Sequence, residues 1–481
     1  MTKFENSAEW VRPLLGSQEY ARLLAAIEEP LALSIRLNLL KEPQLLPSWS
    51  TRYGWEVERV PFCPNGYRIK TFDRNPSATI EHRLGYFYIQ EAASMLPVEL
   101  FDFNCIKNPL ILDMAASPGG KTTHLADRTL DNGLIIANDA SRSRIPALRV
   151  VLQNWGVINQ AITCMPGERI GTLLPDCFDA VLLDAPCSMQ GLRTAESHTI
   201  RKVTPGEVDS LAMRQVRLLE SALRAVRPGG QVVYATCTLT PQEDEGVLDH
   251  ILRNYQGQVH LADVSHSLPG AAPPLRSVSG KPLEGQVSRA LRIWPHLFQT
   301  AGFFCAKFIK DNPLPVSGAV DMQPSPSGLL PKLVAHKASL QIMQAVSDQF
   351  GFDLAALMEK QGLELFEFHG DVILMPQDLK IRLPGLHFLS TGMLLGSQTD
   401  KGWMLSHEFT TRFGSQFTHS VVVLDEDSLP EWERGADIRG LDANKELIGR
   451  MVVVRDASGR NLGRGKLLAN RLRNLLPTRL F

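Results

Sequence analysis

The feature that most constrains this chain is a repeated pattern in which a short apolar run precedes a helix-forming segment. Leu110–Ala116 (LILDMAA) begins the series, and Leu134–Asn138 (LIIAN) precedes a helix expected over 141–155. Ser141 is the expected N-cap of that helix, and Gly156 is its expected stop. Repeated strand–helix units of this kind predict an α/β fold with a doubly wound parallel sheet.

Three further apolar runs extend the pattern. Asp179–Asp184 (DAVLLD), Gln231–Thr236 (QVVYAT) and Phe303–Ile309 (FFCAKFI) are typical of buried strands. Between the first two, apolar residues at helical spacing from Leu219 predict a helix that stops at the turn Pro228-Gly229-Gly230. The sheet is therefore expected to extend to about residue 310.

The chain divides into segments of different character. Residues 1–95 lack the strand–helix pattern, and the α/β core follows over 96–311. Residues 312–328 are rich in Pro, Ser and Gly, which is typical of a linker. Residues 329–481 are expected to form short strands and turns.

Composition narrows the class of protein. No apolar run approaches the roughly 18 residues of a membrane span, and the polar N-terminus lacks the apolar core of a signal peptide. We therefore expect a cytoplasmic protein with no membrane partner. The net charge of −1 gives no global sign of nucleic-acid binding, yet residues 450–481 hold eight Lys and Arg against one acid. This tail is either a solvated basic face or a phosphate-contacting patch, whose candidates are Arg464, Lys466, Arg471 and Arg473.

The chain has seven cysteines, and no pair has C-x-x-C spacing, which disfavours a disulfide framework and a metal site. A lone thiol in such a chain is usually an inert buried group. Cys187 and Cys237, however, follow the expected strands 179–184 and 231–236. Because the carboxyl ends of parallel strands meet at one edge of the sheet, we expect both thiols there, beside Asp184.

A small-residue turn, Ser117-Pro-Gly-Gly-Lys121, is expected at the same edge. A P-loop would need glycine at position 115, which is alanine, and the adjacent Gly119 and Gly120 do not fit the dinucleotide fingerprint. A nucleoside cofactor that lacks phosphate fits better, because Asp139 ends the next strand and is placed to accept hydrogen bonds from ribose. S-adenosylmethionine is such a cofactor. The alternative is a turn without a ligand.

These residue types together suit methylation of cytosine at C5. A thiolate that adds to C6 makes C5 nucleophilic enough to accept an electrophilic methyl group. An acid near N3, here Asp184, would stabilise the adduct, and Lys121 is the candidate for favouring the thiolate. A second thiol or base would then assist loss of the C5 proton.

The chain resembles the Sun family of RNA cytosine-C5 methyltransferases over about residues 34–310. The motifs that carry the resemblance are SIRLN (34–38), YIQEAAS (88–94), DMAASPGGKT (113–122), LLDAPCS (182–188), RPGGQVVYATCTL (227–239) and RIWPHLFQTAGFFCAKF (292–308). The resemblance implies a Rossmann-type class I methyltransferase core with S-adenosyl-L-methionine as cofactor. GLHFLSTGMLLG (385–396) and GRGKLLANRLRNLLP (463–477) are similar to the C-terminal part of bacterial members, which ends in a PUA-like RNA-binding module.

The resemblance also implies a role for each matching residue. The cysteine of the TC motif, Cys237, is the nucleophile, and that of the PC motif, Cys187, assists product release. Asp184 handles the target base, Asp139 binds the ribose, and Asp184 and Glu168 are further candidates for cofactor contacts. The residues expected to cradle the cofactor are Ala115, Ala116, Ser117, Pro118, Gly119, Gly120 and Lys121.

Two positions depart from the family pattern. The family often places an aspartate near the adenine, about 18 residues before the acid of the DAPC motif, where this chain has Pro166; Glu168 is the candidate replacement. The family motif DAPCSG reads DAPCSM here, so Met189 stands where glycine is usual, and the next glycine is Gly191. The loop that carries Cys187 could therefore differ in shape.

The implied function is methylation of a cytosine in 16S ribosomal RNA by a monomeric enzyme whose partner is ribosomal RNA or the small ribosomal subunit. Residues 1–95, as an RNA-binding domain, and the PUA-like region 329–481 would position the RNA. The alternatives are a transfer RNA substrate, a non-catalytic RNA-binding assembly factor, and an exocyclic-amine methyltransferase. The last would carry an Asn/Asp-Pro-Pro-aromatic clamp where this chain has Asp184-Ala-Pro-Cys187.

Overall fold

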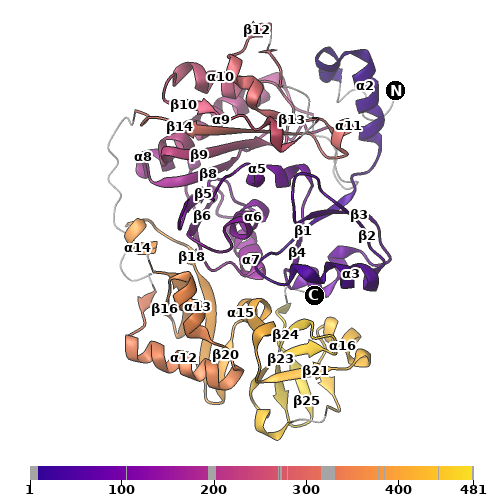
Figure 1. The fold of residues 1–481 in the computed structure, drawn as a ribbon, viewed down its shortest axis with the longest axis vertical. Coiled ribbons are helices and arrows are strands. Elements are labelled where there is room, and N and C mark those ends of the chain that lie inside the picture. Colours follow the sequence, from indigo (N-terminus) through magenta and orange to yellow (C-terminus); the bar gives the residue numbers. More distant parts are fainter. Residues whose placement is uncertain are drawn as a thin grey trace.

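The computed structural model describes residues 9–104, 106–192, 202–268, 270, 274–278, 280–315, 331–377, 379–383, 385–441 and 444–478. Most of the expected linker, from 316 onward, lies outside the described residues, as does Cys105. The centre of the molecule is a mixed sheet of strand order β10-β14-β9-β8-β5-β6-β7-β18 (Figure 1), which β13 extends by pairing with β14.

Five parallel strands form the middle of this sheet: β5 (Leu110–Asp113), β6 (Leu134–Asn138), β7 (Gln160–Thr163), β8 (Phe178–Asp184) and β9 (Val226–Thr236). Helices cover both faces: α5 (Leu96–Glu99), α6 (Gly120–Thr129) and α7 (Ile145–Trp155) on one, and α8 (Ile170–Leu173), α9 (Pro205–Ala225) and α10 (Glu245–Asn254) on the other. Successive strand residues point to opposite faces. Leu110 and Leu112 accordingly join the core under α9, whereas Ile111 joins the core under α6 and α7. The predicted doubly wound fold is confirmed for these strands.

The expectation that every strand is parallel is wrong at one end of the sheet. β14 (Phe303–Lys310) runs antiparallel to β9, with Phe304 opposite Thr236. It also pairs antiparallel with β10 (Val259–Leu261) and β13 (Leu291–Ile293). A parallel connection needs a crossover of a dozen or more residues. Only the four-residue helix α11 (Pro295–Phe298) separates β13 from β14, so these two strands must pair antiparallel.

The helix expected from Ser141 begins instead at Ile145. The Asp139 carboxylate accepts a hydrogen bond from the Ser141 amide at 2.8 Å, which keeps these residues in a turn. Pro146 lacks the N–H that an interior helical position requires, and it fits the first turn instead. At the other end the prediction is confirmed, because Gly156 ends the helix with φ of 85°.

Two other boundaries also differ from the expected ones. The strand expected to reach Ala116 ends at Asp113, because the following residues form the small-residue turn. α9 ends at Ala225 rather than at Pro228-Gly229-Gly230, which lie within β9. The backbone becomes extended at Val226, opposite Phe178 of β8, so strand pairing begins before the glycines.

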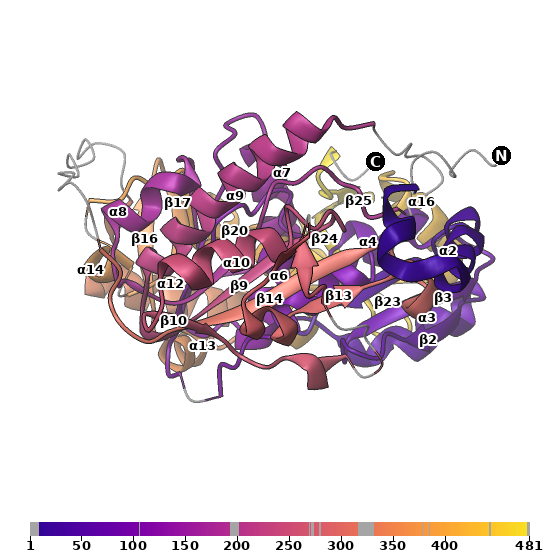
Figure 2. The same cartoon turned by 90° about the horizontal axis from the view of Figure 1, so that it is seen from above.

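The N-terminal part forms a four-stranded antiparallel sheet of order β2-β3-β1-β4. Its elements are α2 (Arg12–Glu28), β1 (Leu33–Leu37), α3 (Leu46–Tyr53), β2 (Glu56–Arg59), β3 (Gly66–Thr71), α4 (Ile80–Arg83) and β4 (Phe87–Ile89). α2 lies beside α11, and its buried Leu23 and Ile27 share a small core with Leu239 and Trp294 (Figures 1 and 2). Leu239 is two residues after Cys237, so the N-terminal helix supports that loop.

The C-terminal part contains two five-stranded sheets. The first consists of β15 (Lys332–Leu333), β16 (Leu363–Phe368), β17 (Asp371–Pro376), β19 (Met393–Thr399) and β20 (Gly402–Leu405), with α12 (His336–Phe350), α13 (Leu354–Gln361) and α14 (Leu379–Arg382). The second consists of β21 (Val421–Leu424), β22 (Ile438–Arg439), β23 (Met451–Asp456), β24 (Asn461–Leu468) and β25 (Arg471–Asn474), with α15 (His407–Phe413) and α16 (Leu429–Glu433). The 15-residue helix α12 contradicts the expectation of only short strands and turns. No side chain of the described residues caps its N-terminus, and it becomes helical by burying Val346 and Phe350 against the first sheet.

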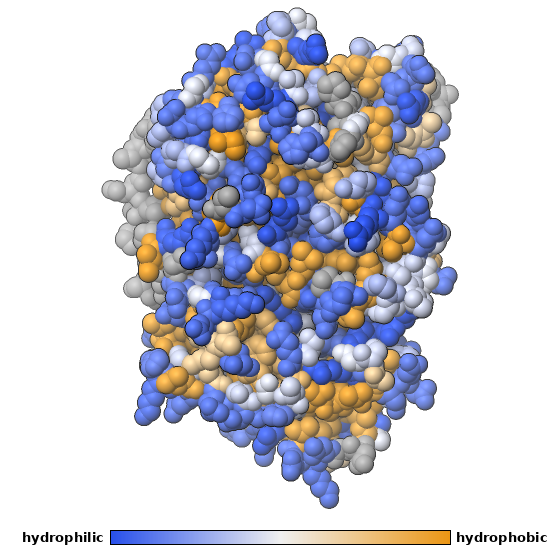
Figure 3. Space-filling view, in the orientation of Figure 1, coloured by the Kyte–Doolittle hydropathy of each residue, from blue (hydrophilic) through white to orange (hydrophobic). Residues whose placement is uncertain are grey.

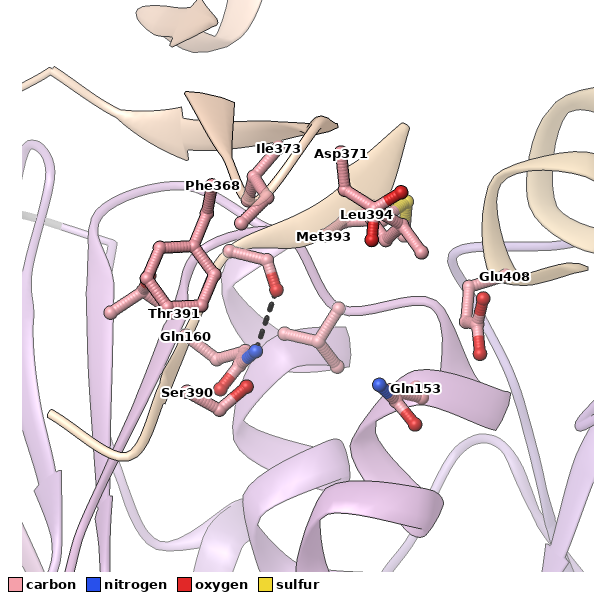
Figure 4. A pocket seen from close by; sticks show the side chains of 12 residues that line it. Gln153, Gln160, Phe368, Asp371, Ile373, Ser390, Thr391, Met393, Leu394 and Glu408 are labelled. Carbon is pink, nitrogen blue, oxygen red and sulfur yellow. Dashed lines mark hydrogen bonds between the residues drawn. The ribbon is translucent and has the colours of Figure 1, made fainter. Parts of the chain in front are cut away.

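The first C-terminal sheet is joined to the α/β core through β18 (Ser390–Thr391), which pairs antiparallel with β7 at the edge of the central sheet. Next to this contact, Gln160 donates a hydrogen bond to the Gly392 carbonyl at 2.7 Å (Figure 4). A cavity of about 140 Å³ lies here, between Gln153 and Gln160 of the core and Phe368 and Asp371 of the C-terminal part. The region after residue 330 is therefore attached to the core by backbone pairing.

The second C-terminal sheet packs on the N-terminal sheet. Trp432 and Val452 share one core with Leu37 and Trp49. At the margin of this core, the buried Arg460 side chain contacts Glu81 of α4 at 2.8 Å and Asp456 at 2.8 Å. The first and last parts of the chain thus form one packed unit.

Polar residues cover most of the face drawn in Figure 3, with apolar patches between them. Among the described residues, no helix has the length and apolar character to cross a membrane.

The contacts of Arg460 provide a test of the packing between the N-terminal sheet and the second C-terminal sheet. Arg460→Ala would remove the cation that pairs with the buried Glu81 carboxylate, which would keep its hydrogen bond from the Tyr53 hydroxyl, and the loss of one member of a buried pair typically destabilises a protein by about 3 kcal/mol. We expect a clear drop in the melting temperature, measured by differential scanning fluorimetry. As a control, Arg253→Ala removes an exposed pair with Asp249 and should leave the melting temperature unchanged. Equal melting temperatures for the two variants would contradict the importance of this contact.

Candidate active site

Two thiols meet at the carboxyl edge of the central sheet. β8 and β9 pair in parallel with Asp184 opposite Ala235, so the loops after both strands leave the sheet at the same level. Cys187 lies in the first loop and Cys237 in the second, and their Sγ atoms are 3.2 Å apart. The convergence expected from the strand pattern is thus observed.

The two thiols differ in acidity. The hydrogen bond between the two thiols lowers the pKa of Cys237, although burial and the charge of Asp184 oppose this effect; nearby Lys121 lowers it further. The same hydrogen bond and burial raise the pKa of Cys187 well above its usual range. Cys237 is therefore the thiol that ionises first, and a thiolate is the nucleophilic form of cysteine.

Lys121 and Asp184 form an ion pair beside the thiols. Lys121 lies in the first turn of α6, and its Nζ is 2.7 Å from the carboxylate of Asp184 at the end of β8. Burial alone would lower the pKa of Lys121, but the attraction of Asp184 outweighs it and the pKa is raised. A permanent positive charge therefore stands near Cys237.

A cavity of about 210 Å³ opens next to this pair. Its lining consists of Tyr88, Ile89, Gln90, Glu91, Ser94, Asp113, Ala115, Ala116, Ser117, Pro118, Gly120, Lys121 and Asp184. The turn needs its glycines: Gly119 has φ of 116°, and a Cβ on Gly120 would lie 2.8 Å from the Tyr88 ring. Most of the residues expected to cradle a cofactor are therefore brought together, and Tyr88 and Gln90 of the YIQEAAS motif join them.

Asp139 lies next to the small-residue turn 117–121. Its carboxylate accepts hydrogen bonds from the Ser117 amide at 3.2 Å and the Ser141 amide at 2.8 Å, and Arg144 lies 3.3 Å away. These bonds fix the turn against the end of β6. Asp139 is thus adjacent to the cavity, although it is not part of the lining itself.

Asp113 is a residue to which the sequence reasoning gave no role. It ends β5 and accepts a hydrogen bond from the Thr122 hydroxyl at 2.6 Å, whereas its other oxygen, Oδ1, is buried with no partner among the described residues. Burial, helped by the nearby Asp184 charge, raises the pKa of Asp113 to about 7. Its place at the strand end directly before the small-residue turn was the available signal.

Glu168 does not join the site. It does not line the cavity, and its carboxylate pairs with Arg214 of α9 at 3.0 Å. The neighbouring Gly167 packs closely on Leu218 of the same helix, so the segment is held against α9. The expectation that Glu168 replaces an adenine-contacting aspartate has no support in these contacts.

Met189 keeps the backbone of a glycine position. Its φ is 59°, in the left-handed region that glycine adopts without strain, and its side chain is exposed. The backbone at Met189 therefore has a conformation that glycine, the residue usual in the family motif, adopts without strain.

The four candidate phosphate contacts lie on β24 and β25, away from β8 and β9, the strands that precede the two cysteine loops (Figure 1). Lys466 faces Arg473 across the hairpin, and Arg471 faces Leu468, so these basic side chains share one face. Arg471 also pairs with Asp437 at 3.2 Å. Arg464 differs from the others, because it donates a hydrogen bond to the Leu405 carbonyl and burial lowers its pKa.

A twisted sheet with this strand order, with a small-residue turn after β5 and a cavity beside it, defines the Rossmann-like α/β fold of methyltransferases. The crystal structure of a methyltransferase homolog protein from Pyrococcus horikoshii is 31% identical to this chain, covers 64% of it and 100% of its own chain, and superposes with a TM-score of 0.55. NSun6 from the same organism, 23% identical over 64% of this chain and 98% of its own, shares the fold with a TM-score of 0.53.

Sequence comparison narrows the class to a family. The profile described as "16S rRNA methyltransferase RsmB/F" matches residues 103–309, and "N-terminal domain of 16S rRNA methyltransferase RsmF" matches 5–92. Ribosomal RNA small subunit methyltransferase F of Aeromonas salmonicida is 32% identical over 95% of this chain and 92% of its own length. The enzyme of the same name from Salmonella arizonae is 34% identical over 87% of this chain and 85% of its own. The chain belongs to the 16S rRNA methyltransferase RsmB/F family, and its methyl donor is S-adenosylmethionine.

The residues of the cavity fit this cofactor. Three carboxyl groups, Glu91, Asp113 and Asp184, line it against the single ammonium of Lys121. S-adenosylmethionine carries an ammonium and a sulfonium, and both are positive. The buried Oδ1 atom of Asp113 has no hydrogen-bond donor among the described residues, and a cationic ligand would supply one. The pocket therefore favours a positively charged ligand.

This fit predicts a pH-dependent affinity. Because the pKa of Asp113 is about 7, its carboxylate forms as the pH rises from 6 to 8, and the affinity for S-adenosylmethionine should rise over the same range. Asp113→Asn keeps the shape but cannot ionise, so it should bind about tenfold more weakly at pH 8 and show a flatter profile. Isothermal titration calorimetry measures both, with Asp249→Asn on the distant surface as control. A steep profile in Asp113→Asn would assign the pH dependence to another group.

Proposed function

We propose that this protein transfers a methyl group from S-adenosylmethionine to C5 of a cytosine in 16S ribosomal RNA through a covalent adduct between Cys237 and C6. The observation that carries the proposal is the 3.2 Å contact between two thiols of unequal acidity, next to the Lys121–Asp184 pair. A methyltransferase that acts on a more nucleophilic atom needs no thiol at this edge.

In the proposed reaction, Cys237 acts as the nucleophile. Its sulfur forms a bond to C6, and the displaced electron pair is shared between C5 and N3, where a hydrogen bond from the Asp184–Lys121 pair stabilises it. When bound, the cofactor would supply an electrophilic methyl group for C5 and would be left as the neutral thioether. The hydrogen bond with Cys187 and, to a lesser extent, the charge of Lys121 favour the ionised form of the Cys237 sulfur before the attack.

Cys187 acts at the end of the reaction. When the C5 proton leaves to a base and the C5–C6 double bond forms again, the bond between C6 and the Cys237 sulfur breaks. Cys187, 3.2 Å from that sulfur, donates a hydrogen bond to the departing thiolate. The two cysteines thus act in sequence on the same carbon–sulfur bond.

We further propose that the parts outside the core hold the RNA. The target base must leave its stack to reach the thiols, and this requires contacts on the flanking nucleotides. Residues 1–95 would form an RNA-binding domain and residues 329–481 a PUA-like region, around the core of 96–311. The enzyme would act as a monomer in the cytoplasm on ribosomal RNA or the small ribosomal subunit.

Two cysteine variants test the assignment of roles. Cys187→Ala removes the donor to the departing thiolate, so the protein should remain covalently attached to RNA and give a slow-migrating band on a denaturing gel. Cys237→Ala cannot form the adduct, and we expect no band and a loss of methylation of at least a thousandfold. Full methylation by Cys237→Ala would refute its role as the nucleophile.

The substrate is tested in cells. Deletion of the gene should remove 5-methylcytosine from a site in 16S ribosomal RNA, as measured by mass spectrometry of nucleosides, and the wild-type gene but not the Cys237→Ala form should restore it. Loss of 5-methylcytosine from transfer RNA alone would identify transfer RNA as the substrate instead.

The salt dependence of RNA binding tests the basic hairpin. Each lost phosphate contact reduces the slope of log K against log salt by about 0.7 to 0.9, so replacing Lys466, Arg471 and Arg473 by Ala should reduce it by about 2. Arg464→Ala is the matched control, since its guanidinium is bonded to the Leu405 carbonyl, and its slope should equal that of the wild type. Filter binding over a range of salt concentrations measures the slopes, and an unchanged slope in the triple variant would exclude this patch.

A further inference from the structure

Glu243 is a buried carboxylate behind the two cysteine loops. It lies just before α10, and its side chain is fully buried. Oε1 accepts hydrogen bonds from the Ser188 amide at 2.9 Å and from Gln215 Nε2 at 2.9 Å. Oε2 accepts hydrogen bonds from the Thr240 hydroxyl at 2.5 Å and from the Ser188 hydroxyl.

These four donors come from three separate parts of the chain. Ser188 directly follows Cys187 in the loop after β8, whereas Thr240 is three residues after Cys237 in the loop after β9. Gln215 belongs to α9, and its Nε2 also donates to the Pro186 carbonyl at 3.0 Å, on the other side of Cys187. One carboxylate therefore connects both cysteine loops and the helix that supports them.

All four donors are neutral groups, and among the described residues no side-chain cation pairs with Glu243. The buried Arg292 instead contacts Asp244 at 3.2 Å and also Glu245, the two residues that follow Glu243. A buried carboxylate is costly unless it is fully hydrogen-bonded, and an ordinary packing role would be served as well by an apolar side chain. Its position at the junction of the two loops therefore indicates a specific role.

We propose that Glu243 is a positioning residue that clamps the Cys187 loop to the Cys237 loop and thereby sets the contact between the two sulfur atoms. The Ser188 and Thr238 hydroxyls also form a hydrogen bond, 3.1 Å long, that connects the two loops directly. Glu243 orients the Ser188 hydroxyl for this hydrogen bond. The negative charge of Glu243 also helps to raise the pKa of Cys187, which keeps that thiol protonated as the donor to Cys237. The inference deepens the proposed function, because it concerns the site on which that function rests.

The test measures thiol reactivity in the full-length protein without RNA or cofactor. Iodoacetamide alkylates thiolates, and peptide mass spectrometry gives separate rates for Cys187 and Cys237 between pH 6 and 10. In the wild type we expect Cys237 to react first, at a lower apparent pKa than Cys187. In Glu243→Ala the preference for Cys237 should fall at least tenfold and its apparent pKa should rise, because Cys187 no longer holds its hydrogen bond. Unchanged selectivity in the folded variant would overturn the proposal.

Two further variants keep the test decisive. If Glu243→Ala does not fold, the pair Ser188→Ala and Thr240→Val removes both hydroxyl donors to Oε2 and should lower the selectivity in the same direction; unchanged selectivity there would also overturn the proposal. Asp131→Asn is the control, because Asp131 is also buried and accepts hydrogen bonds from the Ile158 and Asn159 amides and from Arg412, near the start of β6 and away from the thiols. This variant should destabilise the protein without changing the selectivity between the two thiols. If its selectivity fell as much as that of Glu243→Ala, the role of Glu243 would be one of general stabilisation only.

The kinetics of methyl transfer give a second test of the role of Glu243. Glu243→Ala should lower kcat at least tenfold and leave the KM for S-adenosylmethionine within about twofold, since Glu243 does not line the cofactor cavity. Thiol selectivity is measured without any methyl transfer, so its outcome is independent of the substrate. If the wild type methylates no cytosine but retains the selectivity, the proposed function fails while the role of Glu243 stands.

Discussion

The pairing of β8 with β9 is the constraint on which the site depends. These strands are neighbours in space, but Cys187 and Cys237 are 50 residues apart in the chain. Parallel pairing with Asp184 opposite Ala235 brings the two loops to the same height above the sheet. A shift of one residue would move one loop by about 3.3 Å and turn its side chains to the other face. The contact between the sulfur atoms, the acidity of Cys237 and the nearby Lys121–Asp184 pair all follow from this register.

Sequence reasoning located the thiols because it needed only local information. Apolar runs that end at Asp184 and Thr236 indicate buried strands, and the geometry of a parallel sheet places the loops after both strands at one edge. The small-residue turn and Asp139 were found in the same way. The direction of β14 could not be predicted in this way, because an apolar strand pattern carries no information about the orientation of the strand. The helix α12 was also missed, since it depends on burial against a sheet formed by later residues.

Several side chains have partners that are distant in the chain, and sequence reasoning could not predict these partners. Asp113 is unusual because one of its oxygens is buried without a partner among the described residues, and only the folded packing shows this. Glu168 was a plausible ligand by position, yet Arg214 of α9 engages it. Arg464 belongs to a basic stretch, but its guanidinium is bonded to the Leu405 carbonyl. Charge and spacing in a sequence give the type of a side chain, whereas its partners decide its role.

The two residues of β18 limit where the chain could be cut to give a stable fragment. They cover the outer edge of β7, where the backbone groups of Ala161 and Ile162 would otherwise face water. An uncovered edge strand is a template for pairing with other chains and so for aggregation. A fragment cut after residue 315 would expose that edge together with the apolar side chains beneath it. In this chain, the outer edge of the α/β core is thus completed by a segment that lies some 80 residues beyond its last strand.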